Sequence, residues 1–319
     1  MKYYLGIDTS NYTTSVAAYL EDGAMLSEKK LLPVAPGEKG LRQNDAVFLH
    51  TKQLPQVAEK LFARLPEDAR LAGVGVSTRP RDAEGSYMPC FLAGRTFAYG
   101  IAASAKAPLK ELSHQAGHIA AALYGADRVD LLASDFIAFH VSGGTTEGLL
   151  VKSSRDGISV DIASKTLDIS AGQLIDRIGV RLGFGFPAGA HMDKLALAHN
   201  GDVSAKPVLK GADCCLSGVE NVCARLLDEG VSPESVAAYC FGYVAETLVR
   251  VSRRLREEYG ALPILCAGGV MSSEYIRNYI SARVENAVFT KPEFSSDNAA
   301  GTAYLAAALG GDYRGVKEE

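Results

Sequence analysis

Residues 2–20 read KYYLGIDTSNYTTSVAAYL, and this stretch decides the fold class. An apolar run at 2–7 is followed by polar residues and then by a second apolar run at 16–20. Two β-rich runs joined by a short polar segment are typical of a hairpin. A second stretch, FIAFHVSGGTTEGLLV at residues 136–151, has the same form around SGGT, although the two stretches are not close in sequence.

The segments outside these two hairpins alternate between strand and helix patterns. Further strands are expected at 71–77 and 263–267, and helices at 94–107, 116–123, 171–182, 236–259 and 297–309. Alternation of this kind predicts an α/β protein with mostly parallel sheets in three layers. Because the hairpin form occurs twice, we expect two α/β halves of similar topology with a cleft between them.

A boundary between the two halves is expected in the short polar stretch at residues 125–134. It divides the chain into a first lobe at 1–130 and a second lobe at 131–296, with the C-terminal helical segment 297–319 packing back on the first. A chain of 319 residues is long enough for two domains with separate cores.

Composition and charge restrict the class of protein. A net charge of −4 means that a long nucleic acid would need a local basic patch or a basic partner. No apolar run reaches membrane-spanning length, and no signal peptide is visible, so no membrane association is expected. The six cysteines form no CxxC pair, which indicates reduced, buried thiols and a cytoplasmic protein.

Three glycine-containing turns follow expected strands, at residues 6–10, 141–146 and 266–270. Glycine lets a ligand approach backbone N–H groups closely, which suits phosphate. Ordinary hairpin or strand-to-helix turns explain the same residues equally well. The candidate ligand-binding residues in these turns are Asp8, Thr9, Ser10, Val141, Ser142, Gly143, Gly144, Thr145, Gly268 and Gly269.

His114 and His118 lie in HQAGH, and in a helix their imidazoles share one face. That spacing lets both rings reach one cation, although two histidines on a helix surface would look the same. The candidate third ligand is Asp297, which otherwise suits a helix N-cap. Asp176 and Asp193 lie beside glycine turns, where they would bind ribose hydroxyls or remain solvated helix charges.

In this order, the motifs resemble the TsaD family, historically named O-sialoglycoprotein endopeptidase or Gcp, over nearly the whole chain. The matching stretches are LGIDTS (5–10), HQAGH (114–118), VSGGT (141–145), AGQLID (171–176), FPAGAHMDKLA (186–196), LSGVEN (216–221), CAGGV (266–270) and PEFSSDNAAGTAY (292–304). The resemblance implies the actin-like ATPase fold, a duplicated ribonuclease H-like α/β architecture with two lobes and a central cleft. It also implies an acyltransferase that moves a threonylcarbamoyl group from threonylcarbamoyl-AMP to N6 of adenosine 37 in tRNA.

The resemblance also implies ligands and partners. It implies an iron or zinc ion on His114, His118 and Asp297, and an ATP- or AMP-type nucleotide or threonylcarbamoyl-AMP. The residues implied for the nucleotide or intermediate are Val141, Ser142, Gly143, Gly144, Thr145, Asp176, Gly189, Asp193, Gly268, Gly269 and Ser273. The expected partners are TsaB-like and TsaE-like subunits and tRNA, and a homodimer remains open.

Several positions depart from the family pattern. Two acidic residues are replaced by Tyr12 and Thr13, and the family's Gly-Pro-Gly stretch by the loop at 79–85. Other replacements are Thr145 for a histidine, Gln173 for a glutamate, Ser273 for an asparagine and Ala116 for a glutamate.

These departures leave two alternatives open. One is a carbamoyl-type transferase with another acceptor, in which Arg79 and Arg81 bind an anionic group. The other is a nucleotide-binding partner subunit without catalysis. A metallopeptidase is disfavoured, because HQAGH lacks the glutamate of HExxH.

Overall fold

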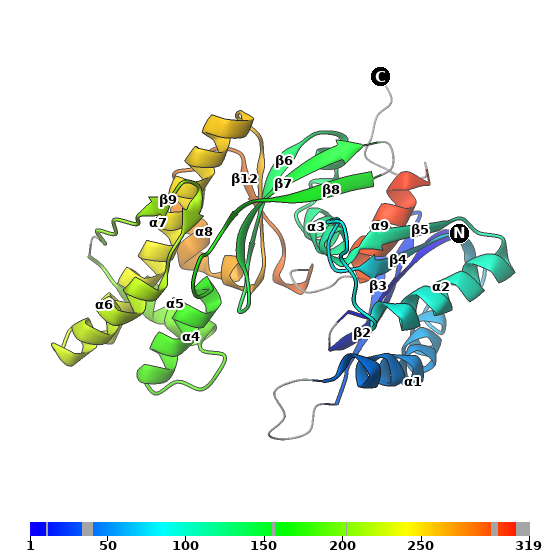
Figure 1. Cartoon of the computed structure of the whole chain (residues 1–319), viewed down its shortest axis with the longest axis horizontal. Coiled ribbons are helices and arrows are strands. Elements are labelled where there is room, and N and C mark those ends of the chain that lie inside the picture. Colours follow the sequence, from blue (N-terminus) through cyan, green and yellow to red (C-terminus); the bar gives the residue numbers. More distant parts are fainter. Residues whose placement is uncertain (11, 34–40, 155–156, 202, 295–298, 311–319) are drawn as a thin grey trace. The chain divides into compact units, whose positions relative to one another are not determined.

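The structure is a computed structural model that describes the whole chain except residues 11, 34–40, 155–156, 202, 295–298 and 311–319 (Figure 1). The chain forms two compact units, which we describe separately. Unit 1 comprises Met1–Ser134, Lys152–Val160 and Ser296–Glu319, and unit 2 comprises Asp135–Val151 and Asp161–Ser295.

Unit 1 is built on a five-stranded sheet in the order β3-β2-β1-β4-β5. Its strands are β1 Lys2–Asp8, β2 Thr13–Leu20, β3 Met25–Leu31, β4 Arg70–Arg79 and β5 Leu109–Ser113. Its helices are α1 Gln43–Phe62, α2 Phe91–Ala105, α3 His114–Gly125 and α9 Ala299–Leu309, with a 3₁₀ turn at Val129–Ala133. Because β1 and β2 are antiparallel, Asp8 at the end of β1 lies opposite Ser15.

The sheet of unit 1 is covered on both faces, which gives three layers (Figure 1). Leu5 and Ile7 on β1 share a core with Leu61 of α1 and Ala98 of α2. Helix α9 packs on the opposite face of the sheet, where β1 and β4 present glycine. A Cβ on Gly6 would lie 2.0 Å from the backbone oxygen of Ala299, so only glycine lets α9 lie this close to β1.

Unit 2 repeats the arrangement with the sheet order β12-β11-β6-β7-β8. The main strands of this sheet are β6 Phe136–Val141, β7 Thr146–Ser154, β8 Gly157–Lys165, β11 Ile264–Ala267 and β12 Ala287–Phe289, of which the end of β7 and the start of β8 fall in the segment Lys152–Val160 that is grouped with unit 1. Unit 2 also has a short pair, which consists of β9 Leu209–Lys210 and β10 Asp213–Cys214. Its helices are α4 Ala171–Arg181, α5 Gly189–Ala198, α6 Ser217–Asp228, α7 Pro233–Tyr259 and α8 Glu274–Ser281, with 3₁₀ turns at Gly269–Ser272 and Pro292–Phe294. The buried face of α7 is central to the core of this unit.

The prediction of mostly parallel sheets was wrong, because both sheets are mixed. In unit 1, β1 pairs in parallel with β4, and β4 with β5, whereas the β1–β2 and β2–β3 pairs are antiparallel. In unit 2, β11 is parallel to β6 and β12, but β6 and β7 are antiparallel. The tight turns between consecutive strands explain the difference, since a parallel pair needs a long crossover.

The six cysteines are all free, and only Cys215 is not fully buried. Within the described part of the chain, none of the helices has both the length and the apolar character needed to cross a bilayer.

Candidate functional site

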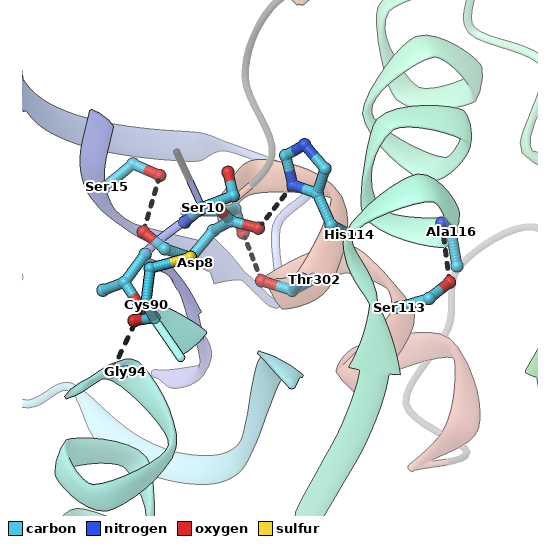
Figure 2. Close-up of polar contacts among 11 residues, drawn as sticks. Asp8, Ser10, Ser15, Cys90, Gly94, Ser113, His114, Ala116 and Thr302 are labelled. Atoms are coloured by element: carbon cyan, nitrogen blue, oxygen red, sulfur yellow. Dashed lines mark hydrogen bonds and ion pairs between the residues drawn. The ribbon is translucent and has the colours of Figure 1, made fainter. Parts of the chain in front are cut away.

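The first candidate site lies in unit 1 where β1 ends beside the start of α3 (Figure 2). The Asp8 side chain is buried, and its Oδ2 lies 2.9 Å from Nδ1 of His114. Its Oδ1 accepts a hydrogen bond of 2.9 Å from the Ser10 amide. The Asp8–His114 contact joins residues 106 positions apart in the chain.

The charge state of Asp8 indicates which of the two atoms, Oδ2 of Asp8 or Nδ1 of His114, carries the hydrogen in their contact. Burial favours a higher pKa for Asp8, but the charge of His114 and the hydrogen bonds from His114 and Ser10 together hold the pKa well below its usual range. An ionised carboxylate only accepts hydrogen bonds, so Nδ1 of His114 carries the shared proton. When the ring is neutral with its proton on Nδ1, Nε2 carries no proton and is the atom that can bind a cation.

His118 follows one turn later on α3, and its ring centroid is 4.5 Å from that of His114. Both residues are half-buried. Histidines that bind a metal commonly donate their second ring N–H to a carboxylate, and the Asp8–His114 pair has this form. The two histidines and their buried carboxylate therefore fit a metal such as zinc or iron.

The predicted third ligand, Asp297, lies outside the described residues. Among the residues that the structure describes, no group of three or more His, Cys, Asp and Glu side chains is arranged to hold a metal ion. Two of the three expected ligands therefore lie together, and the third stays a prediction.

Close helix packing fixes the position of α3. A Cβ on Gly301 of α9 would lie 1.8 Å from the backbone oxygen of Gly117, which lies between the two histidines on α3. The first turn of α3 is capped by Ser113, whose Oγ accepts a hydrogen bond from the Ala116 amide at 3.1 Å. The histidine pair thus stands on a helix held at its side and at its N-terminus.

Thr9, a candidate for phosphate binding, has protein partners in the structure. Its hydroxyl donates to the backbone oxygen of Cys90 at 3.0 Å and accepts from the Gly94 amide at 3.1 Å. Thr9 is fully buried, and Ser10 is nearly so. These contacts tie the end of β1 to α2, and they account for Thr9 through packing.

The second candidate site lies in unit 2, in the turn between β6 and β7. The Ser142 hydroxyl lies 2.9 Å from that of Thr145 and accepts hydrogen bonds from the Gly144 and Thr145 amides. Gly143 and Gly144 are exposed. A Cβ on either would meet nothing within 4 Å among the described residues, and neither has the positive φ that favours glycine.

Gly172 and Gly268 next to this turn differ from Gly143 and Gly144, because packing explains them. A Cβ on Gly172 would lie 2.6 Å from the backbone oxygen of Ser142. Gly268 has a φ of +100°, and its Cβ would lie 2.2 Å from the backbone oxygen of Val141. The fold therefore requires glycine at 172 and 268 but not at 143 and 144, where the exposed backbone is open to a ligand.

The two carboxylates predicted to contact a nucleotide have partners within unit 2. Asp176 accepts a hydrogen bond of 2.8 Å from the Ala188 amide. Asp193 accepts from the Ser273 hydroxyl at 2.5 Å and from the Glu274 amide at 3.0 Å, so it caps the start of α8. Both residues organise backbone segments, while Gly189 and Gly269 have open space where a side chain would be.

Two residues that depart from the family pattern have clear structural roles. Gln173 accepts from the Ser170 amide at 3.1 Å and completes a capping box at the start of α4. Arg79 donates to Asp82 at 2.8 Å, so its guanidinium has a carboxylate partner within its own loop. Tyr12, in place of an acidic residue, is 43% exposed.

Comparison with known proteins gives one family. The family model described as TsaD, tRNA N6-adenosine threonylcarbamoyltransferase, matches residues 37–304. A curated protein of that name from Methanopyrus kandleri is 26% identical over 94% of this chain and 85% of its own length. Another from Thermosipho africanus is 29% identical over 93% of this chain and 91% of its own.

Solved structures show the same fold. HypF from T. kodakarensis superposes with a TM-score of 0.61 at 12% identity, over 98% of this chain and 48% of its own. Component A of (R)-2-hydroxyglutaryl-CoA dehydratase from Acidaminococcus fermentans has a TM-score of 0.56 at 16% identity, over 98% of this chain and 100% of its own. The expected α/β fold of the actin-like ATPase class is therefore confirmed.

Proposed function

The chain belongs to the TsaD family of tRNA N6-adenosine threonylcarbamoyltransferases, and from this we propose that it transfers a threonylcarbamoyl group from threonylcarbamoyl-AMP to N6 of adenosine 37 in tRNA. The observation that carries the proposal is the Asp8–His114–His118 cluster, found in a chain that matches the family over 37–304. In the reaction, the adenosine amine attacks the carbamoyl carbon, the bond to the AMP phosphate oxygen breaks, and N6 loses one proton.

We assign the metal site to His114, His118 and Asp297. A bound iron or zinc ion would supply a Lewis acid that polarises the donor. Asp8 holds Nδ1 of His114 and fixes the ring so that Nε2 is presented as the ligand atom. The two rings on adjacent turns of α3 provide the first two ligands from one rigid element.

We assign the nucleotide phosphate to the turn at Ser142–Thr145. Its two open glycines allow a phosphate to approach backbone amides, and the Ser142 and Thr145 hydroxyls hold the turn in shape. Catalysis of this kind depends mainly on positioning and on charge stabilisation. In the same proposal Asp176 and Asp193 shape the segments that carry Gly189 and Ser273.

The proposed partners are TsaB-like and TsaE-like subunits. A relative from Methanothermobacter thermautotrophicus is named a probable bifunctional tRNA threonylcarbamoyladenosine biosynthesis protein, so a second biosynthetic activity is joined to the family domain there. With a net charge of −4, tRNA binding would need a local basic patch or a basic partner, and in this proposal a partner contributes. We propose that the protein acts in the cytoplasm.

A second function, carbamoyl-type transfer to another acceptor, is favoured by one specific observation. The acidic pair of the family is replaced by Tyr12 and Thr13, and Tyr12 is exposed at the end of the β1 hairpin. Loss of a general acid or base typically lowers a rate by about 10²–10⁴-fold. An altered acceptor is one way in which the chain would tolerate that loss.

The test incubates the purified chain with threonylcarbamoyl-AMP, its TsaB-like and TsaE-like partners and unmodified tRNA, followed by mass spectrometry of the nucleosides. Modified adenosine supports the proposal, and His114→Ala should abolish it while His199→Ala, a histidine of unit 2 outside both sites, should not. AMP release without modified tRNA would favour the second function. Nucleotide binding without AMP release would show a non-catalytic subunit.

A further inference from the structure

The loop after β4 is where this chain departs from the family's Gly-Pro-Gly stretch, and in the structure it contacts the start of α3. The Pro80 backbone oxygen accepts a hydrogen bond of 3.1 Å from the Gln115 amide. Two residues along, Asp82 accepts a hydrogen bond of 2.9 Å from the Ser113 hydroxyl through its Oδ2. The loop therefore binds the first turn of the helix that carries both histidines.

Three side chains form a continuous chain of hydrogen bonds in this region. Arg79 donates to Oδ1 of Asp82 at 2.8 Å, and Ser113 donates to Oδ2 of the same carboxylate. Because the Ser113 hydroxyl donates its hydrogen bond to Asp82, its oxygen lone pairs face the Ala116 amide, from which it accepts a hydrogen bond of 3.1 Å. Both carboxylate oxygens are thus occupied, and the Ser113 rotamer is fixed in the capping position.

The location of Asp82 is electrostatically favourable. A carboxylate before a helix N-terminus interacts favourably with the unpaired N–H groups of the first turn. The Asp82 side chain is 18% exposed, so solvent screens this interaction less than at a free surface. Arg79 orients the carboxylate without removing it from the helix end.

From this arrangement we infer that Asp82 is a positioning residue for the histidine pair, acting through Ser113, with Arg79 orienting Asp82. His114 directly follows the N-cap residue of α3. Its ring is held by the hydrogen bond to Asp8, and its backbone position is held by the first turn of α3. Freeing the Ser113 rotamer would let the first turn fray and separate the two imidazoles. The inference rests on the proposed metal site at His114 and His118.

The test measures affinity for Co²⁺ and Zn²⁺ and the visible absorption of bound Co²⁺, with the full chain in its metal-free form. Asp82→Ala and Ser113→Ala should each weaken metal binding by roughly fivefold to tenfold, because loss of an N-cap removes about 1 kcal/mol from the helix that carries both rings. Ser113→Thr keeps the hydroxyl and should restore affinity to within about threefold of the unchanged protein. Glu84→Ala, which removes an exposed carboxylate from the same loop, is the matched control.

The double variant tests whether Asp82 acts through Ser113. If it does, Asp82→Ala combined with Ser113→Ala should weaken binding no more than either change alone. If Asp82 has a purely structural role, Asp82→Ala should have a lower thermal midpoint, but its Co²⁺ spectrum and affinity should equal those of Glu84→Ala. That result would overturn the inference.

Separate control experiments distinguish a variant that fails to fold from one that folds but binds metal weakly. If Asp82→Ala does not fold, Arg79→Ala replaces it, because Arg79 is 37% exposed and its loss leaves the cap contact in place. Arg79→Ala should reduce metal affinity by a smaller factor, and an affinity unchanged from Glu84→Ala would refute the role of the loop. Absence of metal binding in the unchanged protein would refute the metal site together with this inference, whereas failure of the variants alone leaves the proposed function standing.

Discussion

The contrast between glycines that packing requires and glycines that it does not gives the sharpest test of the nucleotide site. Replacing Gly143 or Gly144 by alanine adds a Cβ that meets nothing within 4 Å among the described residues. We therefore expect the free energy of unfolding to stay the same or to rise by about 0.4–1 kcal/mol, because alanine restricts the unfolded chain. Binding of AMP should weaken at least tenfold, about 1.4 kcal/mol, since the methyl group occupies the approach to the backbone.

Two further variants give this experiment its controls. Gly172→Ala places a Cβ 2.6 Å from the Ser142 oxygen, so it should cost about 1–3 kcal/mol of stability and distort the same turn. Gly218→Ala changes an exposed glycine of α6 with equally open space, so it should leave AMP affinity unchanged and raise stability by about 0.5–1 kcal/mol. Calorimetric titration with AMP and urea unfolding separate the two effects. Unchanged AMP affinity in both Gly143→Ala and Gly144→Ala would refute the assignment of the phosphate to this turn.

Three other predictions concern the scaffold. Gly301→Ala puts a Cβ 1.8 Å from the Gly117 oxygen and should cost at least about 1–3 kcal/mol in urea unfolding. Gly100→Ala, at an exposed glycine of α2 whose Cβ would meet nothing within 4 Å among the described residues, is the matched control, and an unchanged midpoint for Gly301→Ala would be the contrary result. Asp8→Asn should weaken Zn²⁺ binding about 10–100-fold in a competition titration, and equal affinities would argue against an orienting role. Burial favours a higher pKa for Asp168, but hydrogen bonds from the Leu216 amide and from Ser217 hold the pKa below its usual range. The ionised Asp168 therefore stabilises the fold above the unfolded pKa of about 3.9, and this stabilisation is lost as the pH falls through the lower folded pKa. Asp168→Asn should therefore be less stable than the unchanged protein at pH 7 and should lose less stability on acidification, and parallel pH profiles would contradict this.

Local patterns predicted much of the fold because their residues carry the signal within a few positions. The expected helix at 236–259 matches α7 at Pro233–Tyr259, and the two hairpins are β1–β2 and β6–β7. Strand β3 was missed because its sequence, MLSEKKL, is largely polar and lies at the sheet edge. Helix α1 was missed as well, and a proline at position 55 within it obscures the pattern.

In the candidate sites too, contacts between residues close in the sequence were predictable, whereas contacts between distant residues were not. The contact between His114 and His118 follows from helical spacing, so the sequence predicted it. The Asp8–His114 bond joins residues 106 positions apart and depends on how β1 and α3 pack, which no local pattern specifies. The Asp193 cap on α8 is also a tertiary contact, across 80 residues. Among the site residues that the sequence analysis missed, Ser113 carried a local signal, because serine directly before a helix is a preferred N-cap. The predicted boundary between two domains near residues 125–134 stays a prediction.

The departures from the family pattern differ in what they do to the scaffold. Gln173 makes the same capping box that a glutamate would make, but without the negative charge. The Ser170 hydroxyl of that cap donates to the Gly143 oxygen at 2.7 Å, so the lost charge was next to the turn that we assign to phosphate. A neutral residue there reduces repulsion of an anion, and the fold is kept. Tyr12, by contrast, is exposed and replaces an acidic side chain without restoring its charge. Under our proposal, the changes therefore leave the turn assigned to the donor's phosphate intact and remove acidic groups at the β1 hairpin, so the acceptor is the part of the reaction that would differ from the family.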